Sequence, residues 1–391
     1  MRRGITLLFF VLAFAICRSE DMDTLRSEIL ADTLSVHKKD KNIITKIIDY
    51  FSETNKVKPN KQYDFSILGG PHYSSETKFG LGVMAAGLYK RNLNDTITPM
   101  SMVGLYGDFS TTGFYLVGIK GYHLFPLEKY RLNYKLYFYS QPNYFWGMGY
   151  DKNSNDDNEM SYRRKQFKID ADFTIRVAEN VYIGPTGQFC IISGSHIEDG
   201  GDWLWEEQKL NITSSAVGFV MSYDTRDNIA NAFSGVNLEL HQRFYPAFIG
   251  NKYAFSSTEL TGNYYCQVWK GGVIATQLHG LFTYGNTPWT MMPSITSSNG
   301  LRGYYDGRYN DKCEIDATVE LRQHVWHRNG LVAWVGAGNV FPKFSALRLR
   351  NTLPNYGVGY RWEFKTRINV RLDVGFGNGE KGIVFNVNEA F

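Results

Sequence analysis

The chain has 391 residues, with 42 Lys and Arg against 38 Asp and Glu and a formal net charge of +4. It contains no block of basic residues that would indicate a nucleic-acid partner. Aromatic residues make up 15% of the chain, yet the mean hydropathy is only −0.31. Beyond the N-terminal segment no run reaches about 18 consecutive apolar residues, which excludes membrane-spanning helices. A transmembrane β-barrel has such a composition, because only alternate residues of each strand meet lipid.

Residues 1–19 have the layout of a secretory signal peptide. Arg3 precedes an apolar run at 5–16, and small or polar residues follow. The run is too short to cross a bilayer as a helix. Cys17 leaves a lipoprotein signal open as an alternative, although Ile16 is bulky where such a signal needs a small residue.

Three cysteines follow the signal peptide: Cys190, Cys266 and Cys313. An odd and scattered set argues against a disulfide framework, and the spacing fits no metal-binding motif. We therefore expect neither a metal nor another cofactor.

Residues 20–61 are predicted to form a periplasmic linker with a short amphipathic helix. Ile44, Ile47, Ile48 and Phe51 recur on one helical face. One interpretation is a solvated linker, and the other is a helix lying on the periplasmic membrane surface or against a barrel mouth. The segment is short for a folded periplasmic module.

From Asp64 onward the apolar residues alternate with a period of two. The clearest strand is 367–376, where Leu372 and its apolar neighbours oppose Asn369, Arg371 and Asp373. A soluble sandwich would not place two arginines and an aspartate on the inner face of a central strand, whereas a water-filled lumen would accept them. The final segment continues the apolar parity through Phe385 to Phe391, and an aromatic C-terminal residue is an assembly signal shared by outer-membrane barrels.

The same alternation, weaker in each segment, predicts about sixteen strands. On the strand at 357–364, Val358, Tyr360, Trp362 and Phe364 should face outward. The fold class is therefore all-β, a transmembrane antiparallel β-barrel over residues 62–391, located in the bacterial outer membrane. Parity places the connections at 151–160 and 193–211, and the long loop that carries Arg302, outside the cell. That loop is long enough to fold inward.

Four motifs, in order, resemble the barrel domain of the BamA/TamA superfamily, also called the bacterial surface antigen family. These are Tyr223 to Asn228 with Gly235 following, Leu301-Arg302-Gly303-Tyr304, Glu320-Leu321-Arg322, and Trp334 to Phe341. The larger members carry periplasmic repeat domains, for which the segment before this barrel is too short.

The resemblance implies that Arg302, with Gly303 and Tyr304, locks the loop to the inner wall opposite the lateral seam. Gly336 stands where the family has an aspartate. Since an unpaired lumenal guanidinium is costly, another acid must replace it. We favour Glu320 and Asp373, with Asp316 as a third option. Alternatively, these acids are ordinary lumenal charges paired with Arg322, Arg361 and Arg371.

Asp224, Arg226 and Asp227 lie at a predicted strand-to-turn junction. We interpret them as fixing a periplasmic turn by local hydrogen bonds rather than as catalytic residues. The proline that the family has in this turn is absent.

The resemblance implies a barrel that assists insertion or translocation of proteins, or of lipids, across the outer membrane. A weak seam between strands at 65–70 and 382–391 would open sideways and template a client strand. The expected partners are the lipid bilayer, client outer-membrane proteins, and periplasmic or lipoprotein partners. Alternatives are a passive channel or surface adhesin and, less favoured, a barrel hydrolase. No serine is recognisably arranged with His279, His324 or His327, so we expect no enzyme.

Overall fold

The computed structural model describes residues 62–391, apart from 75–76, 93–94, 96–97, 198–210 and 297–299. The predictions of a signal peptide at 1–19 and of a linker helix at 20–61 lie outside the described residues. No helix in the described part of the chain has both the length and the apolar character needed to cross a membrane. Cys190, Cys266 and Cys313 are free thiols.

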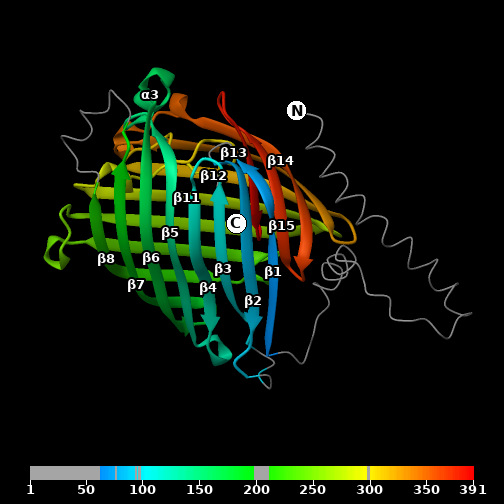
Figure 1. Ribbon diagram of the computed structural model, residues 1–391. Coiled ribbons are helices and arrows are strands. Elements are labelled where there is room, and N and C mark those ends of the chain that lie inside the picture. Colours follow the sequence, from blue (N-terminus) through cyan, green and yellow to red (C-terminus); the bar gives the residue numbers. More distant parts are fainter. Residues whose placement is uncertain (1–61, 75–76, 93–94, 96–97, 198–210, 297–299) are drawn as a thin grey trace, which may run out of the picture. The chain divides into compact units, whose positions relative to one another are not determined.

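In the part of the chain that the structure describes, sixteen antiparallel strands form one sheet in which every strand pairs with its neighbours in sequence. This order confirms the predicted number and direction of strands, and Figure 1 shows the part from β1 to β8 side by side. The strands are β1 (Tyr63–Ser74), β2 (Lys78–Tyr89), β3 (Ser101–Ser110), β4 (Tyr115–Leu124), β5 (Tyr130–Phe145), β6 (Met160–Ala178), β7 (Val181–Ser195), β8 (Ile212–Asp224), β9 (Gly235–Tyr245), β10 (Phe255–Trp269), β11 (Gly272–Gly285), β12 (Cys313–Trp326), β13 (Asn329–Phe341), β14 (Leu353–Lys365), β15 (Ile368–Phe376) and β16 (Lys381–Val387).

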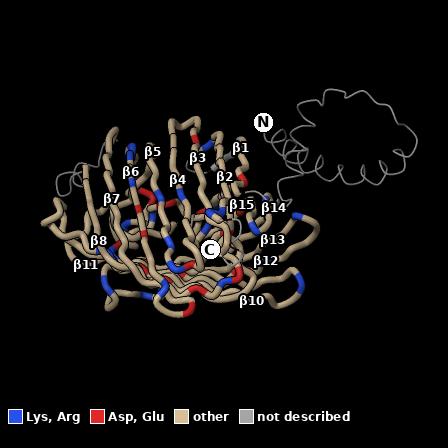
Figure 2. Tube along the Cα trace, turned by 90° about the horizontal axis from the view of Figure 1, so that it is seen from below, with Lys and Arg blue, Asp and Glu red and all other residues tan. Residues whose placement is uncertain are grey.

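The two faces of the sheet differ as the alternation predicts. On β12, Val319 is 45% exposed, whereas its neighbours Glu320 and Thr318 are buried. Charged residues occur along the strands as well as in the connections (Figure 2). A sheet that buries charges on one face and exposes large apolar side chains on the other has the polarity of a barrel in lipid.

The parity of β14 changes near its end, which corrects one expectation. Phe364 was predicted to face outward with Tyr360, but it is only 1% exposed. The register between β14 and β15 shifts between Glu363 and Lys365. Such a bulge adds a residue to one strand and reverses the side to which the following side chains point.

The C-terminus departs from the predicted strand. β16 ends at Val387, and Asn388 adopts a positive φ of 75°. Phe391 therefore does not continue the outward apolar row of Phe385. Instead it packs against Ala232, Tyr265 and Ala275, on the inner side of the sheet.

The ladder does not close within the described residues. β1 pairs only with β2, and β16 pairs only with β15. The two edge strands nevertheless approach to Cα distances within 8 Å. The Nζ of Lys365, at the end of β14, lies 2.8 Å from the Oδ2 of Asp64 on β1. The two edges of the sheet thus lie close together along a seam without a backbone ladder among the described residues, and one ion pair joins β1 to β14 at one end.

The outward parity can be tested at the centre of β11, where Leu278 is 64% exposed and Gln277 is buried. Leu278→Arg should destabilise the protein by roughly 2–4 kcal/mol, because the charge faces the middle of the bilayer. Gln277→Arg should be better tolerated, because Gln277 lines an inner cavity of about 300 Å³ together with Glu259. Reversible unfolding in lipid vesicles would measure both. Equal losses at the two positions would contradict the assignment of faces.

Candidate functional site

Arg302 lies in the connection between β11 and β12, residues 286–312, which we call the inner loop. Its side chain is completely buried. Arg302 Nη2 donates to Glu320 Oε2 at 2.5 Å, and Nη1 donates to Asp373 Oδ2 at 2.9 Å. One guanidinium thus joins the loop to β12 and to β15. Both carboxylates are also fully buried.

The same two carboxylates serve other arginines. Glu320 Oε1 accepts a bond of 2.7 Å from Arg322, and Asp373 Oδ1 accepts one of 2.5 Å from Arg361. Arg371 lies 3.4 Å from Asp373. Arg302 therefore shares both acids with other arginines in one network, so the two alternatives that the sequence left open do not exclude each other. Asp316, the third acid considered, faces His279 instead.

Two further residues, whose contact with Arg302 the sequence did not predict, lie against it. The ring of Trp334 lies 3.6 Å from the guanidinium carbon, which is a cation–π contact. Trp334 Nε1 donates to Asn355 Oδ1 at 2.8 Å, and Asn355 Nδ2 donates to the Arg302 carbonyl at 2.5 Å. Trp334 was visible only as part of a motif. Its contact with Arg302 depends on how β13 and β14 lie under the loop.

Glycines on the wall make room for the loop backbone. A Cβ at Gly375 would collide with the carbonyl of Arg302, and one at Gly303, whose φ is +117°, would collide with Gly375. A Cβ at Gly336 would press against Leu301 and the β12 backbone. The position at which the family carries an aspartate is therefore covered by an apolar loop residue here, and the acids that meet Arg302 lie on β12 and β15.

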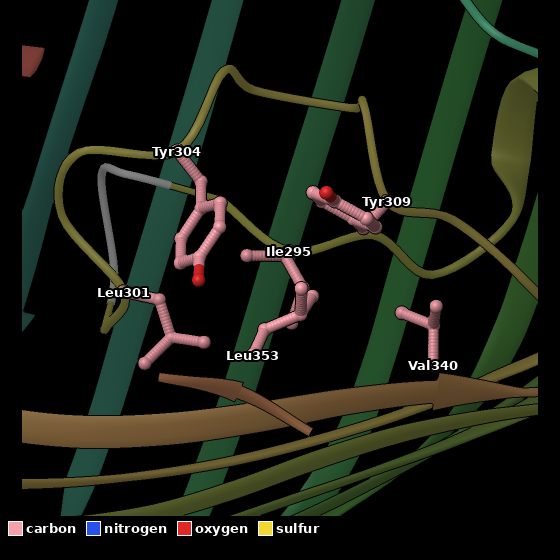
Figure 3. Close-up of a cluster of buried hydrophobic side chains, with 6 residues drawn as sticks. All are labelled: Ile295, Leu301, Tyr304, Tyr309, Val340 and Leu353. Carbon is pink, nitrogen blue, oxygen red and sulfur yellow. The ribbon is translucent and has the colours of Figure 1, made fainter. Parts of the chain in front are cut away.

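An apolar cluster holds the loop on either side of Arg302. Figure 3 shows Ile295, Leu301, Tyr304 and Tyr309 of the loop converging with Val340 of β13 and Leu353 of β14. Tyr304 also donates its hydroxyl to the Pro354 carbonyl at 2.6 Å and accepts from the Asn378 amide at 2.9 Å. Burial raises the pKa of Tyr304, which keeps the hydroxyl protonated as a donor.

The inner loop lies beside the seam. A Cβ at Gly382 of β16 would contact Gly303, and Glu380, which precedes β16, accepts a 2.7 Å hydrogen bond from the amide of Tyr305. Burial raises the pKa of Glu380 above its usual range. The resemblance implied the wall opposite the seam, and this expectation is wrong, because the loop rests on β12 to β16.

The Asp224 turn, residues 224–235, connects β8 to β9. Asp224 pairs with Arg226 at 2.9 Å and with Arg131 of β5 at 3.0 Å. Asp227 accepts from the amide of Phe233 at 2.8 Å and pairs with Arg367, in the β14–β15 turn, at 2.8 Å. These contacts tie the β8–β9 turn to the start of β5 and to the β14–β15 turn. The structural role of Asp224, Arg226 and Asp227 stays a prediction that this arrangement fits.

The C-terminal residues join the ion network from the other side. Glu389 pairs with Arg361 at 2.7 Å, and Arg322 Nη2 donates to the carbonyl of Phe391 at 2.8 Å. The loop and the C-terminal tail thus share Arg322 and Arg361 as neighbours, through Glu320 and Asp373.

These features define a class of protein, a transmembrane β-barrel whose long loop is held inside by a buried arginine. The Omp85 superfamily domain matches residues 120–391, and the chain belongs to that superfamily. It is accordingly an outer-membrane protein of a superfamily whose barrels insert or translocate proteins.

Solved structures agree with this assignment of the fold. BamA from Haemophilus ducreyi lacking POTRA domains 1-3 aligns at 14% identity with a TM-score of 0.53, over 83% of this chain and 70% of that chain. CdiB from Escherichia coli aligns at 11% identity with a TM-score of 0.52, over 84% of this chain and 64% of that chain. Curated protein sequences gave no match. At these identities the likeness establishes the fold alone.

Replacing Arg302 should release the inner loop without preventing insertion of the barrel. Arg302→Ala should cost roughly 1.5–3 kcal/mol, the range for hydrogen bonds to charged groups, because Glu320 and Asp373 keep Arg322 and Arg361 as partners. Arg302→Lys retains the charge, but a lysine cannot bridge two acids as the planar guanidinium does. Arg302→Lys should therefore be nearly as unstable as Arg302→Ala. Unfolding in detergent would give the stability, and protease cleavage would report on the loop.

Double-mutant cycles of Arg302→Ala with Glu320→Gln and with Asp373→Asn should each show coupling. Arg243→Ala, which removes a partner of Glu259 outside this network, serves as the additive control. Purely additive effects in both cycles, together with a loop that stays protected, would contradict the lock.

Deleting Phe391 should reduce the amount of inserted protein in cells, because the residue is proposed to be an assembly signal. Phe391→Tyr, which keeps an aromatic end, serves as the control. The heat-modifiable folded form on gels measures the outcome, and an unchanged folded fraction would count against the signal. Refolding of the purified variant into vesicles would report separately on its packing against Tyr265 and Ala275.

Proposed function

We propose that this protein inserts or translocates proteins at the outer membrane by opening sideways between β1 and β16. The observation that carries the proposal is the seam, where two edge strands meet with no backbone ladder between them among the described residues. Exposed edges pair readily with a further strand. A client chain could therefore add to β1 or β16 by β-augmentation.

The two edges are built unequally. β1 comprises 12 residues, including Gly69, Gly70 and Pro71, whereas β16 comprises only seven. Pro71 cannot donate a hydrogen bond, and glycines weaken strand pairing. A short strand beside a strand that donates few hydrogen bonds forms few backbone hydrogen bonds when the seam closes. This supports a low free-energy cost of opening the seam.

Side chains and space on both sides of the seam fit the same proposal. A cavity of about 780 Å³ is lined by β1 residues such as Leu68 and by β16 residues such as Asn386. At one end, the Asp64–Lys365 pair joins β1 to β14. This ion pair limits how far the two edges separate at that end, and the rest of the seam is left able to open.

The inner loop contacts the strands on one side of the seam. Gly303 packs near Gly382 of β16, and Arg302 is bonded to Asp373 of β15, the strand that pairs with β16. A seated loop therefore holds the β15–β16 edge in place, and a released loop would free that edge. The proposed partners are the bilayer beside the seam and unfolded client strands, with periplasmic or lipoprotein partners delivering those clients.

Crosslinking the seam tests the proposal directly. In a background with Cys190, Cys266 and Cys313 replaced by alanine, Leu68→Cys and Asn386→Cys would be joined in cells with a short bis-maleimide. The matched control joins Met84→Cys to Tyr106→Cys, which face each other across the existing β2–β3 ladder. Quantitative outer-membrane proteomics follows before and after crosslinking.

Sealing the seam should lower the level of client proteins, whereas the control crosslink should have no effect. Loss of many barrels would indicate a general insertase, and loss of one exported protein a dedicated translocator. If full crosslinking changed no outer-membrane or exported protein, seam opening would be wrong, and a passive channel or adhesin would be favoured.

A further inference from the structure

We infer that His279, Glu314 and Asp316 form a binding site for a divalent transition-metal cation on the inner wall of the barrel, beneath the inner loop. His279 of β11 and Asp316 of β12 are direct partners across the ladder. One ligand atom from each of the three residues lies within 4.8 Å of the others. His279 Nδ1 is 2.9 Å from Asp316 Oδ2 and 3.4 Å from Glu314 Oε2.

The histidine is oriented as a metal ligand would be. Its other ring nitrogen, Nε2, lies 3.7 Å from Glu259 Oε1. Glu259 is held in turn by Arg243 at 2.9 Å. Metal-binding histidines commonly turn their second nitrogen toward a carboxylate, which fixes the tautomer and the orientation of the ring. Nδ1 is thereby directed at the two acids of β12.

The buried side chain of Asp316 provides a second observation that points to a ligand. Its side chain is 5% exposed, and its Oδ1 has no hydrogen-bond partner among the described residues. This oxygen points toward Gly300, since a Cβ built on that glycine would collide with it. Buried carboxylate oxygens are normally satisfied. Asp316 Oδ1 therefore lies on the side of the cluster that faces the inner loop, where Gly300 and Asp316 both line one cavity.

There is room for an ion and its remaining ligands. A cavity of about 150 Å³ is lined by His279, Glu314, Asp316 and Glu259 on the wall and by Gly300 and Leu301 on the loop. A single water needs only about 10–15 Å³ of such space. Water molecules can complete the coordination of an ion that takes three ligands from the protein.

The charged groups around the cavity also favour binding of a cation. Glu259, Glu314 and Asp316 carry three negative charges when ionised, against one positive charge on Arg243 and at most one on His279. With all three carboxyl groups ionised, the cluster carries an excess of at least one negative charge. Leaving such a charge unbalanced away from water is unfavourable, and a divalent cation offsets it.

The ligand set selects the kind of metal. One imidazole with two carboxylates suits Zn²⁺, Mn²⁺ or Fe²⁺, whereas Mg²⁺ and Ca²⁺ prefer oxygen ligands alone. The sequence gave no sign of this site, and we expected no metal from it. The three ligands come together only through the register of β11 and β12. The inference does not depend on opening of the seam.

The test uses the purified full-length protein in detergent, stripped with a chelator and then dialysed separately against Zn²⁺, Mn²⁺, Mg²⁺ and Ca²⁺. Elemental analysis would measure the bound metal, and the absorption spectrum with Co²⁺ would report a nitrogen ligand. We expect one equivalent of Zn²⁺ or Mn²⁺. His279→Gln and Asp316→Asn should each weaken binding at least tenfold, and the exposed His324→Gln should not.

Heat-modifiable mobility shows whether each variant is folded, and any variant that fails this check is replaced by Glu314→Gln. The inference is overturned if the folded wild type binds no stoichiometric metal. It is equally overturned if binding survives in folded His279→Gln and Asp316→Asn, or if only Mg²⁺ or Ca²⁺ binds. Seam crosslinking should leave metal binding unchanged, which keeps the two proposals separable.

Discussion

The structure depends on a single buried guanidinium that must be paired. Arg302, Glu320 and Asp373 are all removed from solvent, and an unpaired charge in such a place is costly. The two acids come from β12 and β15. Arg302 can therefore pair with both only when the loop, the two strands and the register of the strands between them are all in place. The ion pair itself contributes little net stability compared with apolar packing. Its effect is to give one position of the loop a much lower free energy than any other position.

Other features of the site follow from that position. The loop backbone can reach the acids only because Gly375 and Gly336 leave space for it. Trp334 covers the guanidinium and excludes water, which strengthens the charged hydrogen bonds. Because the anchored loop also touches Gly382, its seating is connected to the edge strand at the seam. In the proposed function, the position of the loop and the opening of the seam therefore depend on each other.

Much of the fold was predictable from the sequence, because lipid on one side and charge on the other impose a strict period of two. That period also placed Glu320 and Asp373 on the inner face. The sequence could not show which acid lies beside Arg302, that Trp334 stacks on it, or that His279 faces Asp316. Those facts depend on register between strands. The bulge after Glu363 and the inward turn at Asn388 are local changes of backbone that an alternating pattern does not encode.

The central claim is that pairing of Arg302 with two acids seats the loop inside the barrel. Hydrogen exchange of the backbone amides at 300–305, measured on the protein in lipid nanodiscs, tests it most directly. The account predicts strong protection in the wild type and loss of that protection in Glu320→Gln/Asp373→Asn, while amides of β2 and β3 stay protected. Equal protection of 300–305 in both proteins would contradict it.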